Sequence, residues 1–169
     1  GKPVALQNIG GVGNIAFVGK NVITSGFDTG PGNSLMDTAV SMFSGGKESF
    51  DRNGRWARAG KIDYAGVLKL LRLPFFELKP PKSLDRDEFS GAFLRRHFLG
   101  RSNARSKYDV LATLNYFTAA SIALAFQRHA PPGTEELIGS GGGALNPVLM
   151  ANMASLLAPV KVYTIARRG

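Results

Sequence analysis

The chain has 169 residues, 44% of them hydrophobic and 20% charged, which is the length and balance of one globular domain. It contains no cysteine, so disulfides and thiolate metal sites are excluded, and we expect a cytoplasmic location. The formal net charge of +9 admits a polyanionic partner, but the basic residues are scattered and form no compact basic arm. We therefore expect neither nucleic acid nor a membrane among the partners.

Three short β-rich runs open the chain, at residues 4–7, 15–18 and 22–25. Their connections are short, which predicts an antiparallel meander. Residues 8–14, between the first two runs, include three glycines. Such a loop could hold an anion against its backbone amides, or it could be a plain hairpin.

The next segment, residues 26–33, reads Gly-Phe-Asp-Thr-Gly-Pro-Gly-Asn and is the most informative part of the chain. We predict a loop that presents Asp28 to a cleft, beside free amide N–H groups at the start of a helix. Asp28 could act as a base or a substrate clamp, or it could form a local turn. Two glycines and a proline are more than a simple turn requires, so we favour the functional interpretation.

Helical spacing of apolar residues follows, with helices predicted at residues 33–43, 63–73, 85–99 and 108–129. The last of these is the longest and most apolar, and we expect it to be a central packing element that falls short of a membrane span. Residues 44–63 are predicted to be exposed. Trp56 lies there among arginines, where packing is a simpler explanation than stacking on a base.

The C-terminal part alternates strands and a helix, with strands predicted at residues 136–139 and 160–163. Asn146 should cap a helix whose first residue is Pro147. A glycine triplet at 141–143 precedes that cap. Such a triplet recurs where nucleotides lie against backbone, although a tight β–α connection would read the same way.

Two histidines, His97 and His129, lie far apart without ligand spacing, so we predict no metal site built from side chains. Serines occur without a histidine partner at any recognisable spacing, which argues against a hydrolase triad.

Taken together and in this order, these segments resemble the anhydro-N-acetylmuramic acid kinase family, which belongs to the class of sugar kinases, Hsp70 and actin. The resemblance covers nearly the whole chain and rests on residues 7–14, 26–33, 50–54, 80–83, 109–114 and 141–147. It implies an α/β fold, namely a ribonuclease H-like, actin-like ATPase lobe. Its mixed five-stranded sheet would have three antiparallel strands and then parallel strands, with flanking helices and a helical insertion at about 44–107. Residues 1–169 would form a single lobe of C-terminal type in a two-lobed kinase, with the first lobe absent.

The same resemblance implies an ATP-dependent kinase for 1,6-anhydro-N-acetylmuramic acid, an amino sugar of cell-wall peptidoglycan recycling, with ATP and Mg²⁺ as cofactors. Water would open the anhydro ring while O6 receives the γ-phosphate. Asp28 would be the catalytic base that activates the water. The implied substrate-binding residues are Thr29, Gly30, Pro31, Gly32 and Asn33. The implied nucleotide-binding residues are Asn8, Gly10, Gly11, Asn14, Gly141, Gly142, Gly143 and Asn146.

Other functions stay open at this point. The lobe could be a non-catalytic nucleotide-binding or dimerisation unit, with a homodimer as a possible state, or part of a kinase for another sugar. Phosphoryl transfer needs two lobes that close around the nucleotide. We therefore expect weak nucleotide binding at most, and negligible turnover, from this chain alone.

Overall fold

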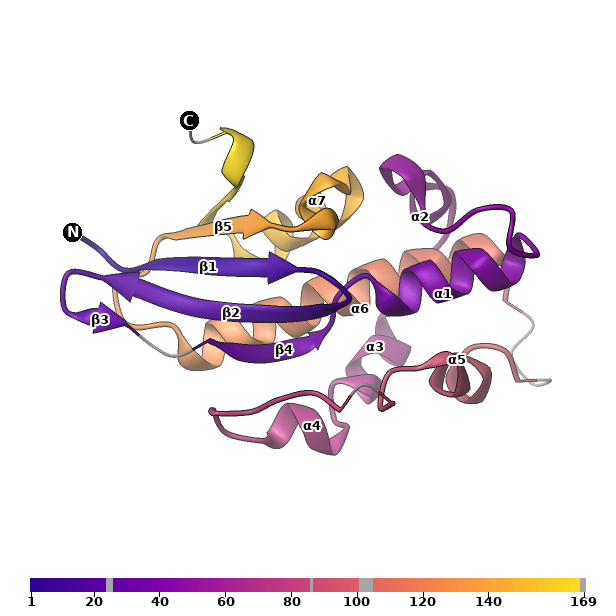
Figure 1. Ribbon diagram of the computed structural model, residues 1–169, viewed down its shortest axis with the longest axis horizontal. Helices are drawn as coiled ribbons and strands as arrows, with labels where there is room; N and C mark the ends of the chain where they lie inside the picture. Colours follow the sequence, from indigo (N-terminus) through magenta and orange to yellow (C-terminus); the bar gives the residue numbers. More distant parts are fainter. Residues whose placement is uncertain (24–25, 86, 101–104, 168–169) are drawn as a thin grey trace.

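The computed structural model contains one mixed β-sheet and describes all residues except 24–25, 86, 101–104 and 168–169 (Figure 1). Five strands follow the order β3-β2-β1-β5-β6, and β4 pairs with β2 off this path. The strands are β1 (Val4–Ile9), β2 (Val12–Gly19), β3 (Val22–Ile23), β4 (Phe27–Pro31), β5 (Glu136–Ser140) and β6 (Lys161–Thr164). The β1–β2, β2–β3 and β2–β4 pairs are antiparallel, whereas β1–β5 and β5–β6 are parallel. This arrangement confirms the predicted fold class.

The chain also forms helices of very different length, the longest of which runs behind the sheet (Figure 1). They are α1 (Ser34–Phe43), α2 (Arg55–Ala59), α3 (Tyr64–Leu70), α4 (Pro74–Glu77), α5 (Gly91–His97), α6 (Lys107–His129) and α7 (Pro147–Leu157). Short 3₁₀ helices are η1 (Arg52–Gly54), η2 (Gly142–Leu145) and η3 (Ile165–Arg167). Helices α2 to α5 all fall between α1 and α6, in the range where the helical insertion was predicted.

Helix α6 is the centre of the core, as its apolar sequence predicts. It contacts β2, β4, α1, α2, α3 and α7. The ring of Phe126 on α6 packs edge-on against Phe17 of β2, with 6.1 Å between centroids. The expectation that no apolar segment reaches a bilayer-spanning length is wrong for α6, which is long and apolar enough. However, 83% of its most apolar stretch is buried inside this molecule, as in the core helix of a globular protein.

The glycine-rich segment 8–14 is more regular than the predicted loop. Strand β1 continues to Ile9 and β2 begins at Val12, so only Gly10 and Gly11 form the turn. Asn8 and Asn14 are paired across the two strands. On β1 the burial alternates, with Ala5, Gln7 and Ile9 inside, because side chains of a strand point to opposite faces.

The predicted Asp28 loop is strand β4. Asp28 pairs with Asn14 of β2, and the register shifts between Gly13 and Asn14, as in a β-bulge. Glycine and proline are depleted in strands, which is why the sequence pattern indicated a loop. At the strand's end Pro31 pairs with Val12, where its missing N–H is tolerated on an edge strand.

Two helix predictions and one prediction of exposure need correction. Residues 85–99 were predicted helical, but only Gly91–His97 form α5. The helix predicted at 63–73 is shorter, because α3 ends at Leu70. Helix α4 then begins at Pro74, and proline suits the first position of a helix. Residues 44–63 are not uniformly exposed, because Asp51 and Trp56 are buried. The Trp56 ring packs inside the protein, and the Nζ of Lys107 lies 4.5 Å from its centroid.

Candidate functional site

Three glycine-containing segments meet beside the start of α1. The amide of Gly32 donates to the Gly11 carbonyl at 2.9 Å, and the amide of Asn33 donates to the Gly10 carbonyl at 2.8 Å. The Ser34 amide also donates to the Gly11 carbonyl, at 3.3 Å. The prediction of free amide groups in this row is therefore wrong for these three residues, because the hairpin turn already occupies their N–H groups.

Close approach of backbone explains the glycines at this junction. A Cβ on Gly32 would overlap the Gly10 carbonyl oxygen, and one on Gly143 would overlap the Ile9 side chain. Gly141 has a φ of +80°, which L side chains rarely adopt. These residues let the hairpin, the β4–α1 junction and the glycine triplet pack together.

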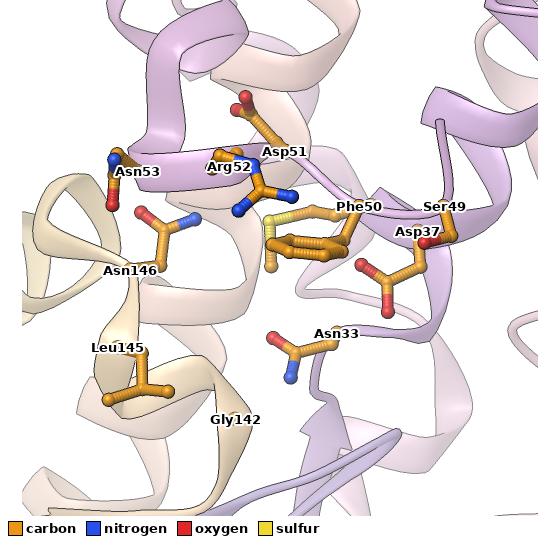
Figure 2. A pocket seen from close by; sticks show the side chains of 11 residues that line it. Asn33, Asp37, Ser49, Phe50, Asp51, Arg52, Asn53, Gly142, Leu145 and Asn146 are labelled. Carbon is orange, nitrogen blue, oxygen red and sulfur yellow. The ribbon is translucent and has the colours of Figure 1, made fainter. Parts of the chain in front are cut away.

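A cavity of about 500 Å³ opens next to this junction (Figure 2). Its walls come from α1, from the segment that leads into η1, and from η2 with the start of α7. The lining residues are Asn33, Met36, Asp37, Ser49, Phe50, Asp51, Arg52, Asn53, Gly142, Leu145 and Asn146. A volume of this size is typical of pockets for small molecules and cofactors.

Several polar groups of the lining hold the walls in place. Asp51 is buried, and its carboxylate accepts from the Trp56 amide at 2.9 Å and from the Ala57 amide at 3.0 Å, which anchors α2. Asn146 caps α7 as predicted, and its Oδ1 accepts from the amides of Val148 and Leu149 at 3.1 Å each.

Two charged side chains in the cavity are not engaged in this way. Asp37, in the first turn of α1, is half-buried, and burial raises the pKa of its carboxyl from 3.8 to about 6. The guanidinium of Arg52 lies 5.3 Å from the centroid of the Phe50 ring, in a cation–π arrangement. An anionic group, a cationic group and an aromatic ring thus line the same space.

Asp28 does not line this cavity. Its carboxylate is half-buried and accepts from the Asn14 Nδ2 at 3.1 Å and from the Leu84 amide at 2.7 Å. The Asp28 amide donates to the Lys82 carbonyl at 3.1 Å, so residues 82–84 run along the outer side of β4. Two donors from different segments fix the orientation of the carboxylate, and each oxygen keeps a lone pair for a further partner.

The residues after Asp28 point into the protein. Thr29 is buried, and its Oγ1 accepts from the Gln7 Nε2 at 3.3 Å. Gly30 faces α6, where a Cβ would come within 3.1 Å of the Ser121 hydroxyl oxygen. Lys82 is half-buried, and its Nζ donates to the Phe75 carbonyl at 3.3 Å. Burial, followed by the nearby Arg128 charge, lowers the pKa of Lys82.

The structure thus divides the predicted site residues into three groups. Asn33, Gly142 and Asn146 line the cavity. Gly10, Gly11, Gly32, Gly141 and Gly143 pack at the junction beside it, and Asn8 lies against Gly141. Asn14, Asp28, Thr29, Gly30 and Pro31 belong to the paired strands β2 and β4.

Sequence reasoning missed several residues of the cavity. Asp37, Phe50, Arg52 and Asn53 were given no role, although the last three belong to a stretch that carried the resemblance. The wall formed by Gly142, Leu145 and Asn146 lies 89 or more residues further along the chain than Asn53, so no local pattern connects the two walls. Within the described part of the chain, no group of three or more Asp, Glu or His side chains is placed to hold a metal ion.

The sheet order is that of a lobe with the actin-like ATPase fold, and two solved structures share this fold. The activator of the 2-hydroxyisocaproyl-CoA dehydratase from Clostridium difficile, solved with bound ADPNP, matches with a TM-score of 0.60 at 11% identity. The match covers 95% of this chain and 53% of that chain. The ethanolamine utilization protein EutJ from Carboxydothermus hydrogenoformans matches with a TM-score of 0.50 at 13% identity, over 97% of this chain and 45% of that one.

Sequence comparison then identifies the family. The family model for anhydro-N-acetylmuramic acid kinase matches residues 2–169, so the chain belongs to that family. A kinase of that name from Xanthomonas campestris pv. campestris (strain 8004) is 41% identical over 165 residues, covering 98% of this chain and 42% of the relative. The kinase from Streptomyces coelicolor is 41% identical over 160 residues, covering 95% of this chain and 40% of the relative. The chain therefore spans less than half the length of the curated relatives it matches.

Proposed function

We propose that this chain is the C-terminal-type, nucleotide-binding lobe of a cytoplasmic kinase that acts on 1,6-anhydro-N-acetylmuramic acid in peptidoglycan recycling. The observation that carries the proposal is the family match over residues 2–169. The actin-like fold and the cavity beside the glycine junction support it. The partner lobe would come from the part of the relatives that this chain does not cover.

The cavity suits a nucleotide. Met36, Phe50 and Leu145 supply apolar surface for a base, and the Arg52 guanidinium supplies positive charge. Mg²⁺ is usually bound through phosphate oxygens, water and one or two carboxylates, so it would enter with the nucleotide and neutralise charge on the transferred phosphoryl group.

Asp28 is our candidate for the catalytic base. A carboxylate that is ionised at neutral pH can accept the proton of a water molecule as the water attacks the anomeric carbon. The C1–O6 bond then breaks, and O6 attacks the γ-phosphate of ATP while ADP leaves. The two hydrogen bonds to Asn14 and Leu84 would keep the carboxylate aimed during this step. The residues from Thr29 to Asn33 remain our candidates for contacts with the sugar.

A chimera tests the proposal. This chain is joined to the part of the Xanthomonas campestris relative that it does not cover, and ADP release and the phosphorylated sugar are measured with ATP and the anhydro sugar. We expect turnover by the chimera and negligible turnover by the chain alone. Asp28→Asn should lower kcat at least about 100-fold without weakening nucleotide binding. Asp87→Asn, the same change on an exposed carboxylate, should leave kcat unchanged.

The alternatives give different results in the same assay. A chimera that binds ATP but phosphorylates no sugar would identify a non-catalytic lobe. A chimera that prefers another sugar would overturn the substrate assignment and leave the kinase assignment standing.

A further inference from the structure

Asp37 is the carboxylate that faces the cavity without a partner. Figure 2 shows its side chain beside Phe50, above Asn33, at the edge of the space that Asn146 and Leu145 bound on the other side. Among the residues that the structure describes, none donates a hydrogen bond to this carboxylate or forms an ion pair with it. The other acid of the lining, Asp51, has both oxygens occupied by backbone amides.

Keeping such a group has a cost that packing does not offset. A half-buried carboxylate without donors is destabilised in its charged form, and this is what raises the pKa of Asp37 to about 6. At neutral pH the group is still mostly ionised, and it then offers two acceptor oxygens and no donor. A ligand that brings hydrogen-bond donors to this side of the cavity would therefore complement the carboxylate.

The chemistry of a nucleotide limits which donors these can be. Phosphate groups are anionic and would be repelled by Asp37, whereas Arg52 on the same cavity would attract them. The adenine edge presents a donor next to an acceptor, which an ionised carboxylate does not complement. The two adjacent hydroxyls of ribose are both donors, and a carboxylate is the group that holds ribose hydroxyls in other nucleotide sites.

We propose that Asp37 binds the ribose hydroxyls of the nucleotide and so makes the cavity selective for ribonucleotides over 2′-deoxyribonucleotides. This inference rests on the proposed nucleotide-binding function. It assigns Asp37 the position of the ribose within the cavity.

Calorimetric titration of the chain with ATP, 2′-deoxy-ATP and 3′-deoxy-ATP tests the inference. We expect the wild-type chain to bind ATP about tenfold more tightly than either deoxy form, the effect of losing one hydrogen bond to a charged acceptor. In Asp37→Asn the affinity for ATP should fall to within about twofold of that for the deoxy forms. Asp87→Asn should keep the wild-type preference.

Other outcomes overturn the inference in distinguishable ways. A wild-type chain that binds all three nucleotides equally, or an Asp37→Asn variant that keeps the preference, refutes the role of Asp37 and leaves nucleotide binding intact. If neither the chain nor the chimera with the partner lobe binds any of them, the nucleotide site itself is refuted. The wild-type comparison needs no variant, so a variant that fails to fold does not decide the result.

Discussion

At position 37 the protein has a carboxylate, and its burial disfavours the ionised form in the folded state, whereas an amide of the same shape would carry no charge. The folded pKa of about 6 lies above the ordinary value of 3.8, so the folded state holds the proton more tightly than the unfolded state. The stabilisation that protonation brings is complete below pH 3.8 and is lost as the pH rises through 6. Above pH 6 the ionised Asp37 therefore lowers the free energy of unfolding relative to a neutral side chain.

We predict that Asp37→Asn stabilises the chain at pH 8, and stabilises it less at pH 5. Because the group is half-exposed, solvent screening limits the gain to below about 1 kcal/mol, or roughly 2 °C in Tm. Thermal unfolding at both pH values measures the difference, with Asp87→Asn as the exposed control. An equal gain at pH 5 and pH 8 would show that ionisation of Asp37 is not its cause. A stabilising change at a ligand-facing residue is the pattern expected where function opposes stability.

At the scale of elements, Asp51 joins the cavity wall to the core. Its carboxylate accepts hydrogen bonds from the backbone amides of Trp56 and Ala57 in the first turn of α2, and α2 contacts α6. Asp51→Ala should lower the free energy of unfolding by about 2 kcal/mol, because two buried amides lose a charged acceptor. It should also weaken nucleotide binding, since residues 49–53 line the cavity. Urea unfolding and calorimetry measure the two effects.

Glu48 provides the matched control for this prediction. It lies three residues before Asp51 and pairs with Arg55, but more than half of the Arg55 side chain is exposed, at 56%. A surface ion pair of this kind contributes little, so Glu48→Ala should cost less than about 1 kcal/mol. If both variants are equally destabilised, the role of the Asp51 carboxylate in anchoring α2 is refuted.

Whether an element could be predicted from the sequence depends on how local its signals are. The long helix α6 and the capped helix α7 follow from apolar periodicity and from Asn146 and Pro147, which are local signals. Helix α2 has five residues and depends on Asp51 and on packing against α6, which no local pattern records. Strand β4 was missed because its pairing with β2 outweighs the low strand propensity of glycine and proline. Only part of the cavity was predicted, because Asn33 and Asn146 lie at helix starts, which local patterns mark, whereas Arg52 meets them only in the fold.

At the scale of the whole molecule, aromatic rings tie the segment between α1 and α6 to the core. Phe117, fully buried on α6, packs against Phe76 at 5.8 Å and against Phe89 at 5.9 Å between ring centroids. Phe89 also packs against Phe93 of α5 at 4.9 Å. The short helices of this segment therefore share one core with the sheet, and we expect the chain to unfold as a single cooperative unit.

Trp56 makes this expectation measurable, because it is the one tryptophan of the chain and lies in that segment. Its fluorescence and the far-UV circular dichroism of the whole chain should give coincident urea transitions. Phe117→Ala should shift both curves together and lower the free energy of unfolding by about 3 to 5 kcal/mol. Leu68→Ala, at a side chain that is 63% exposed, should shift neither by more than about 0.5 kcal/mol. If Phe117→Ala instead separates the two transitions, the segment is an independently melting unit, and the cavity wall that it carries is stabilised by its own contacts rather than by α6.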